Sequence, residues 1–343
     1  MLDFRLSSGG SGSANGPRRG FGFHFPIARA AKAGLCLTCW IPALVFAQTQ
    51  TAGGQGPAVV INGLSLPSAI ASDNQGNLYI VDEGCGIPAP PGDCNVYRET
   101  ASGGGYTQSR VASFTPANLP TSVAVDASGN VYIGVTGKGL YKETLSGQAY
   151  TQSSIGCAFA KPAALAVDGK SNLYVADSET GRVYREKPED SCSTVSVVAS
   201  LKGVIGVAVD SCGSVYVAQS TDTGGIVKET PSGGGYVQSA VGSGMAGLIG
   251  VTVDAHQDLY YSALAGSIGV WIPNGRGYSQ RTVMTGPPLS PIGGLAIDGA
   301  SNLYFADFTN SRVWKAVPSF PLPTAPACGT TPAVPSGATA QPK

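Results

Sequence analysis

The chain has 343 residues, of which 48 are glycine and 24 are proline, while only 12% are charged. Its formal net charge is zero, and without the basic first 47 residues the net charge becomes −4. No basic surface is therefore available to neutralise phosphates, which excludes a nucleic-acid partner, and the glycine-rich composition favours an all-β fold of short strands.

Residues 1–47 predict an export signal. Basic residues are followed by an uncharged, mainly apolar stretch from Ala33 to Ala47, which contains Pro42 and is too short to span a membrane comfortably. We expect cleavage after Ala47, a linker at 48–56 and a secreted or periplasmic location, with no membrane span in the mature chain. An uncleaved anchor is the alternative, and the export route is left open.

One unit recurs six times after the linker. Each copy has an aspartate at the end of a short alternating run, then a turn, then a tyrosine six positions after the aspartate. Successive aspartates are 53, 42, 42, 44 and 44 residues apart. The pairs are Asp73/Tyr79, Asp126/Tyr132, Asp168/Tyr174, Asp210/Tyr216, Asp254/Tyr260 and Asp298/Tyr304. A period of this length predicts a repeat architecture.

The pattern within each unit predicts four strands, which is the composition of a propeller blade. We therefore predict an all-β, six-bladed β-propeller over residues 57–317, acting as a monomer. The last unit lacks a fourth strand, whereas a spare strand at 57–62 precedes the first unit. We expect this N-terminal strand to complete the last blade, because the pairing removes an open sheet edge.

The repeat resembles the NHL repeat in its pattern of V-A-V-D, G-N and Y-V-A-D. Residues 165–177 and 207–218 match this pattern nearly throughout, and the resemblance covers 57–317. The Tyr-Thr-Gln-Ser segments at 106–109 and 150–153 are similar to outer strands of exported bacterial NHL-repeat proteins. The resemblance implies a six-bladed propeller of NHL type and implies no particular activity.

Six cysteines follow the leader, and disulfide bonds are expected in an exported protein. The longest spacing contains an insertion with Cys85 and Cys94, and we predict a bond between them, since a metal site there would lack a histidine. Cys192 and Cys212 fall in turns on the same rim of adjacent blades, which predicts a second bond. A bond between Cys157 and Cys328 is left open.

Two acids follow a repeat tyrosine by three positions and are each followed by an arginine five positions later. The pairs are Asp177 with Arg182 and Asp307 with Arg312. Acid and base are absent together from three other units, which indicates an ion pair that braces the turn between the second and third strands.

No catalytic constellation is evident in the sequence. His256 is the one histidine after the leader and is expected in a solvated turn, so a multi-histidine zinc site is excluded. A G-x-S-x-G nucleophile elbow is absent as well. We assign no catalytic residue, no metal and no cofactor, and we expect a binding protein rather than an enzyme.

Loops on one predicted face carry the candidate ligand-binding residues. This face holds the connections between blades and the turns between second and third strands, where binding sites on rigid scaffolds are found. The candidates are Glu83, Phe159, Lys161, Glu179, Asp222 and Phe308. We expect a binding or scaffolding module for a protein, peptide or glycan. The alternative is a calcium-assisted lactonase-like or lyase-like enzyme with carboxylates at the channel mouth.

The last segment, 318–343, is rich in proline, alanine, glycine, serine and threonine. Such a composition cannot bury a core, so we predict a disordered tail.

Overall fold

The computed structural model describes residues 56–85, 93–155, 157, 159–188, 193–275, 277–284, 291–318 and 328. The chain divides into two units, Met1–Ala47 and Gln48–Lys343, and the description below concerns the second unit alone. The predicted export signal and most of the predicted tail lie outside the described residues. Within the described part of the chain, no helix is present that could cross a membrane.

The described residues contain 24 strands in six antiparallel sheets of four strands each, which confirms the predicted six-bladed propeller. Blades one and two comprise β2 (Pro67–Ser72), β3 (Leu78–Asp82), β4 (Cys94–Ser102), β5 (Gly105–Phe114), β6 (Pro120–Val125), β7 (Val131–Val135), β8 (Gly139–Ser146) and β9 (Ala149–Ile155). Blades three and four comprise β10 (Pro162–Val167), β11 (Leu173–Asp177), β12 (Arg182–Glu186), β13 (Ser196–Ser200), β14 (Val204–Val209), β15 (Val215–Gln219), β16 (Gly225–Ser232) and β17 (Gly235–Ser243). Blades five and six comprise β18 (Leu248–Val253), β19 (Leu259–Ala263), β20 (Ser267–Pro273), β21 (Tyr278–Met284), β22 (Ile292–Ile297), β23 (Leu303–Asp307), β24 (Arg312–Ala316) and β1 (Ala58–Asn62).

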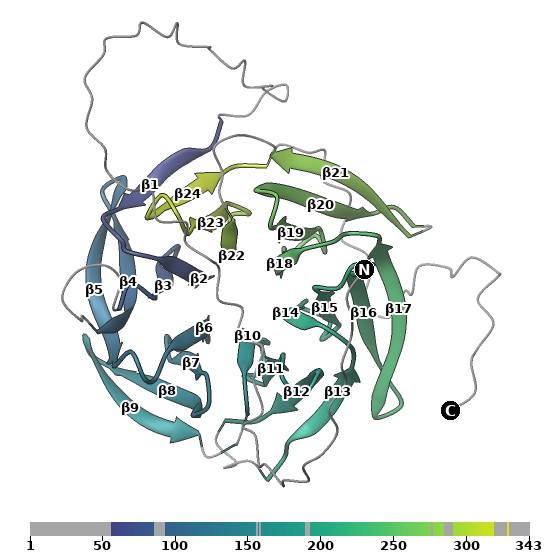
Figure 1. Ribbon diagram of the computed structural model, residues 1–343, viewed down its shortest axis with the longest axis horizontal. Helices are drawn as coiled ribbons and strands as arrows, with labels where there is room; N and C mark the ends of the chain where they lie inside the picture. Colours follow the sequence, from purple (N-terminus) through teal and green to yellow (C-terminus); the bar gives the residue numbers. More distant parts are fainter. Residues whose placement is uncertain are drawn as a thin grey trace, which may run out of the picture. The chain divides into compact units, whose positions relative to one another are not determined.

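The first strand of each blade lies nearest the centre of the ring, and the fourth lies outermost (Figure 1). The second strands read as short apolar runs, and most are buried along their whole length, as β7 is. This burial follows from the ring, because each sheet packs its two faces against the neighbouring blades.

The sixth blade is closed by the strand that precedes the first blade, as predicted. β1 pairs antiparallel with β24, with Ala58 opposite Lys315 and Val59 opposite Trp314. The sheet order is β1-β24-β23-β22, so the sixth blade has four strands like the other five (Figure 1).

The repeated aspartates hold the turn between the first and second strands of each blade. In blade two, Oδ1 of Asp126 accepts the backbone N–H groups of Ser128 and Asn130, both at 2.9 Å. Oδ2 accepts the side-chain amide of Asn130 at 2.8 Å and the hydroxyl of Tyr132 at 3.1 Å. Gly129 supplies the positive φ of 81° that the turn needs. The aspartate and tyrosine therefore recur because every blade needs this turn.

The tyrosines of the outer strands link neighbouring blades. The hydroxyl of Tyr106, on β5 of blade one, donates to the hydroxyl of Tyr304 in blade six at 3.2 Å. The hydroxyls of three further outer tyrosines adjoin repeat tyrosines of the preceding blade in the pairs Tyr150/Tyr79, Tyr236/Tyr174 and Tyr278/Tyr216. The tyrosine of the Tyr-x-Gln segments thus has a packing role.

The predicted acid–arginine ion pairs are wrong. Asp177 lies directly opposite Arg182 in the sheet, but its carboxylate accepts the backbone N–H groups of Ala160 and Lys161, at 2.9 and 3.2 Å. Asp307 likewise accepts the indole N–H of Trp314 at 3.0 Å. Backbone N–H groups are fixed at short range, whereas an arginine must immobilise a long side chain to reach the same oxygens.

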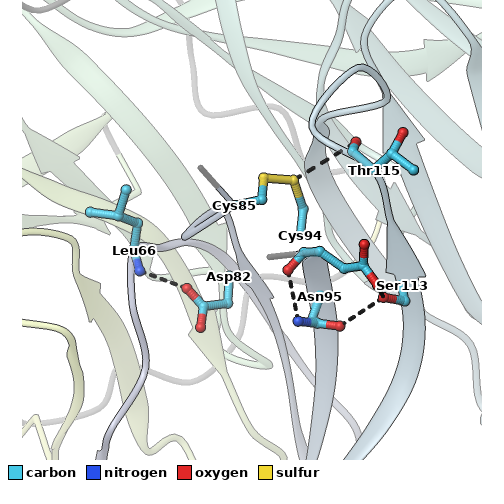
Figure 2. Close-up of a disulfide and its surroundings, with 8 residues drawn as sticks. Leu66, Asp82, Cys85, Cys94, Asn95, Ser113 and Thr115 are labelled. Carbon is cyan, nitrogen blue, oxygen red and sulfur yellow. Dashed lines mark hydrogen bonds between the residues drawn. A yellow bond between two sulfur atoms is a disulfide. The ribbon is translucent and has the colours of Figure 1, made fainter. Parts of the chain in front are cut away.

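One predicted disulfide is present and another is wrong. Cys85 and Cys94 are bonded, with Cα atoms 4.7 Å apart, and Figure 2 shows this bond beside Asp82 and Thr115. Cys212 is bonded to Cys328, with Cα atoms 5.3 Å apart, and not to Cys192, which lies outside the described residues. Cys328 is therefore tied to blade four. Cys157 also forms a disulfide, and Cys328 is not its partner.

Candidate functional site

The propeller has two faces with different chemistry. The face that carries the six aspartate turns (73–77, 126–130, 168–172, 210–214, 254–258 and 298–302) is called the aspartate face here. The opposite face carries the connections between blades and the turns between second and third strands, and is called the connection face. All six predicted ligand-binding residues belong to the connection face.

Six equivalent residues lie on the connection face, each directly after the second strand of its blade. In blades one to five the backbone N–H of this residue donates to the carbonyl of the residue directly before the inner strand. Glu83 donates to Leu66 at 2.9 Å, and Ser178 donates to Lys161 at 3.0 Å. Each member lies four positions after the repeat tyrosine. This mouth ring consists of Glu83, Thr136, Ser178, Ser220, Leu264 and Phe308.

Glu83 is the one charged member of the mouth ring. Its side chain is half-buried, and burial is the main cause that raises the pKa of its carboxyl. The charge of Asp82 raises this pKa further, while the hydroxyl of Ser68 on β2 opposes the shift. The protonated form of the Glu83 carboxyl is therefore more favoured than that of a glutamate carboxyl in water.

Asp82, the neighbour of Glu83, has a structural role instead. Its Oδ1 accepts the backbone N–H of Leu66 at 2.6 Å (Figure 2). Its Oδ2 accepts the backbone N–H of Ser65 at 2.9 Å. Both groups belong to the segment that leads into β2. Asp82 thus fixes the chain next to Glu83 and leaves Glu83 as the carboxyl available to a ligand.

The other sequence-predicted residues are spread around the connection face. Lys161 precedes β10 and is half-buried, and Phe308 is a half-buried member of the mouth ring. Glu179 and Asp222 are exposed in the turns of blades three and four. Phe159 is buried, with 5% exposure, and packs against Tyr184 at 5.3 Å between ring centroids, so the expectation of an exposed aromatic there is wrong.

The described part of the channel is lined by uncharged residues of the inner strands. A cavity of about 180 Å³ lies among the inner strands, toward their aspartate-face ends. Its walls carry no charged side chain, and they consist of Ile70, Ala71, Ser72, Val123, Ala124, Val125, Leu165, Ala166, Val167, Val207, Ala208, Val209, Val251, Thr252, Val253, Leu295, Ala296 and Ile297. The residues that line this cavity therefore supply no acid–base group.

A calcium centre does not fit the donor set of the connection face. Calcium takes six to eight oxygen ligands, several of them carboxylates. Among the described residues no three acid, histidine or cysteine side chains converge on one point, and the mouth ring offers a single carboxylate. His256 lies on the aspartate face, where its backbone N–H donates to Asp254 at 2.9 Å.

Comparisons with known proteins agree on the fold. No protein-family model and no curated protein sequence matches the chain. Many solved structures do match it. A gluconolactonase from Xanthomonas campestris shares 16% identity and a TM-score of 0.58, over 76% of this chain and 89% of that chain. The calcium structure of a family AA12 carbohydrate-active enzyme from Trichoderma reesei shares 14% identity and a TM-score of 0.59, over 79% and 97%.

A virginiamycin B lyase from Staphylococcus aureus shares 12% identity and a TM-score of 0.52, over 74% of this chain and 81% of that chain. What the chain shares with these enzymes is the propeller fold. At such identities the likeness carries no residue role across. The NHL-type assignment remains a prediction from the repeat pattern.

Thr136, Ser178, Ser220 and Leu264 are mouth-ring members that the sequence analysis did not single out. The signal was present, because every one of them follows a repeat tyrosine by four positions. Aligning the six units at this position identifies all six residues, and the one charged residue among them, from the sequence alone.

Proposed function

We propose that this protein is a hydrolase of small cyclic esters that uses Glu83 as a general base at the channel mouth. The observation that supports the proposal is the lone carboxyl of the mouth ring, half-buried and with a raised pKa. Perturbed carboxyls in clefts mark candidate acid–base groups. Two solved structures with this fold are a gluconolactonase and a virginiamycin B lyase, and both favour an enzyme over a binding module.

In this reaction, the carboxylate of Glu83 takes a proton from a water molecule as the water oxygen attacks the ester carbonyl carbon. The ring C–O bond then breaks, and the proton passes to the departing alkoxide oxygen, which gives a hydroxy acid. A base whose pKa lies nearer to neutrality is effective in both transfers. Because the donor set does not fit calcium, no step is assigned to a metal.

Glu83→Gln tests the proposal. The substitution keeps the size of the side chain and removes its basicity, so hydrolysis should fall by about 100-fold or more on a panel of sugar and aliphatic lactones. Glu179→Gln is the matched control, since it removes an exposed carboxyl from the same face. Equal rates for the wild-type protein and Glu83→Gln would reject Glu83 as the base, and loss of activity in EDTA would favour the calcium-assisted alternative.

A binding module for a protein, peptide or glycan is the second candidate. It is favoured by Leu264, a mouth-ring residue with 45% exposure, because a large apolar side chain at a loop-rich mouth suits a bound partner better than water. No turnover on the lactone panel, together with a partner whose affinity falls in Leu264→Ser, would favour this function.

A further inference from the structure

The aspartate turn of blade five differs from its counterparts. In four blades an asparagine donates its side-chain amide to Oδ2 of the turn aspartate at 2.7–2.8 Å. The four asparagines are Asn77, Asn130, Asn172 and Asn302. Asp258 occupies this position in blade five, four residues after Asp254. A second carboxyl therefore stands where four of the other blades place a side-chain N–H donor.

Both carboxyl groups are buried and poorly satisfied. Asp258 is 0% exposed and Asp254 is 6% exposed. Oδ1 of Asp254 accepts the backbone N–H groups of His256 and Asp258, both at 2.9 Å. Within the described part of the chain no donor meets hydrogen-bond geometry at either oxygen of Asp258 or at Oδ2 of Asp254, although the hydroxyl of Tyr260 lies close enough to lower the pKa of Asp254. Leaving two ionised carboxylates in this state is energetically unfavourable.

The neighbouring strand explains why Asp258 finds no donor. In blade one, the oxygen of Asn77 accepts the backbone N–H of Ala101 on β4 at 3.2 Å. The matching residue of blade five, two positions after the partner of Leu259, is Pro273 on β20, which has no N–H. In other blades a lysine or arginine of the third strand lies opposite the repeat tyrosine, as Lys142 does opposite Tyr132. In blade five the residue opposite Tyr260 is Val270, which carries no charge.

The charged and titratable groups that face the pair are few. His256 belongs to the same turn, Tyr260 to β19 and Arg281 to β21. His256 and Arg281 lower the pKa of Asp258, but burial and the charge of Asp254 outweigh them. The cationic neighbours therefore do not remove the conflict between the two acids.

We propose that Asp254 and Asp258 share one proton in the folded protein, and that loss of this proton destabilises the turn of blade five. Two buried carboxyls that raise each other's cost of ionisation cannot both ionise readily, so one retains its proton. A protonated Asp258 donates its O–H to Oδ2 of Asp254 and thereby replaces the amide of the missing asparagine. The pair is thus a pH-sensitive element within an otherwise uniform set of turns.

The direction of the pH effect follows from the shift. Burial, followed by the charge of Asp254, raises the pKa of Asp258 from 3.8 to about 6. A carboxyl with a raised folded-state pKa contributes stability that is present below pH 4 and is lost as the pH rises toward 6. The turn of blade five also adjoins the disulfide between Cys212 and Cys328, because the side-chain amide of Gln257 lies 3.7 Å from the sulfur of Cys212. Deprotonation of the aspartate pair therefore acts on a turn that contacts this disulfide.

Asp258→Asn is the decisive variant, since it restores the residue of the other blades and mimics the protonated acid. Urea unfolding of the wild-type protein and the variant is compared from pH 4 to pH 8. With the pKa at about 6, the wild-type unfolding constant should rise about 100-fold more than that of Asp258→Asn across this range. Asp222→Asn removes an exposed acid from the other face and should retain the wild-type slope.

Parallel slopes for the wild-type protein and Asp258→Asn would overturn the proposal. An infrared difference spectrum between the two proteins at pH 5 supplies a second readout, and it should contain a protonated carboxyl band that disappears at pH 8. Absence of the band would reject the shared proton. Stabilisation of the wild-type protein alone by Na⁺, Mg²⁺ or Ca²⁺ at pH 8 would show that a cation, and not a proton, satisfies the pair.

Discussion

The disulfide between Cys212 and Cys328 should stabilise the protein more than the one between Cys85 and Cys94. The cross-linked residues are 116 positions apart in the first case and 9 in the second. Closing a longer loop removes more conformational entropy from the unfolded chain, and the loop-entropy relation gives about 5 kcal/mol for the long loop and about 3 kcal/mol for the short one. The larger value is an upper bound, because breaking the bond also frees Cys328 in the folded protein.

The perturbation is a pair of double substitutions, Cys212→Ser with Cys328→Ser and Cys85→Ser with Cys94→Ser, which leave no unpaired thiol at either site. Urea unfolding at one pH gives the loss of free energy for each, and the difference between the two losses should be about 2 kcal/mol. A larger loss for the Cys85/Cys94 variant would refute the reasoning. It would mean that local strain or packing around the insertion outweighs the entropy of the long loop.

Two further predictions concern single positions. Burial raises the pKa of Glu186 from 4.5 to about 7, and both of its oxygens lack partners within the described residues, so its contribution to stability is lost between pH 4.5 and 7. In blades one, two and four a glutamine of the outer strand donates its side-chain amide to the equivalent glutamate, as Gln152 does to Glu143 at 2.7 Å. Val195→Gln places such an amide beside Glu186 and should add about 1 kcal/mol above pH 7 in urea unfolding; no gain would refute this pairing. Gly139→Ala should cost more than about 2 kcal/mol, because a Cβ would lie 2.6 Å from the carbonyl oxygen of Cys157, at a φ of 88°. Gly137→Ala, where a Cβ meets nothing within 4 Å at a φ of 70°, should cost clearly less, and equal losses would contradict the steric argument.

Most of the fold was predictable from the repeat. Six aspartate–tyrosine pairs in one phase predict six blades, and a missing fourth strand next to a spare N-terminal strand predicts the closure by β1. These features are predictable because a blade cannot cover its faces alone, so each unit repeats the same pattern. The mouth ring is predictable in the same way, since it occupies one position of the period.

Features without periodicity were not predictable. Cys328 lies in a segment with no repeat pattern, so nothing in the spacing relates it to Cys212. Asp177 and Arg182 do lie opposite each other, but register does not decide which donor a carboxylate selects. The substitution of Asp258 for asparagine is visible in the repeat, yet its meaning depends on burial and on the missing N–H of Pro273.

The borrowed strand also sets the order of events when the chain folds. Among the described strands β1 is the first to be synthesised and β24 is the last, and their paired residues Ala58 and Lys315 are 257 positions apart. Until β24 exists, the sixth blade cannot be completed, and β1 presents an unpaired edge to other chains. Contacts of such long range form slowly. A nascent propeller of this design must therefore remain open, and exposed to aggregation, until its final residues are available.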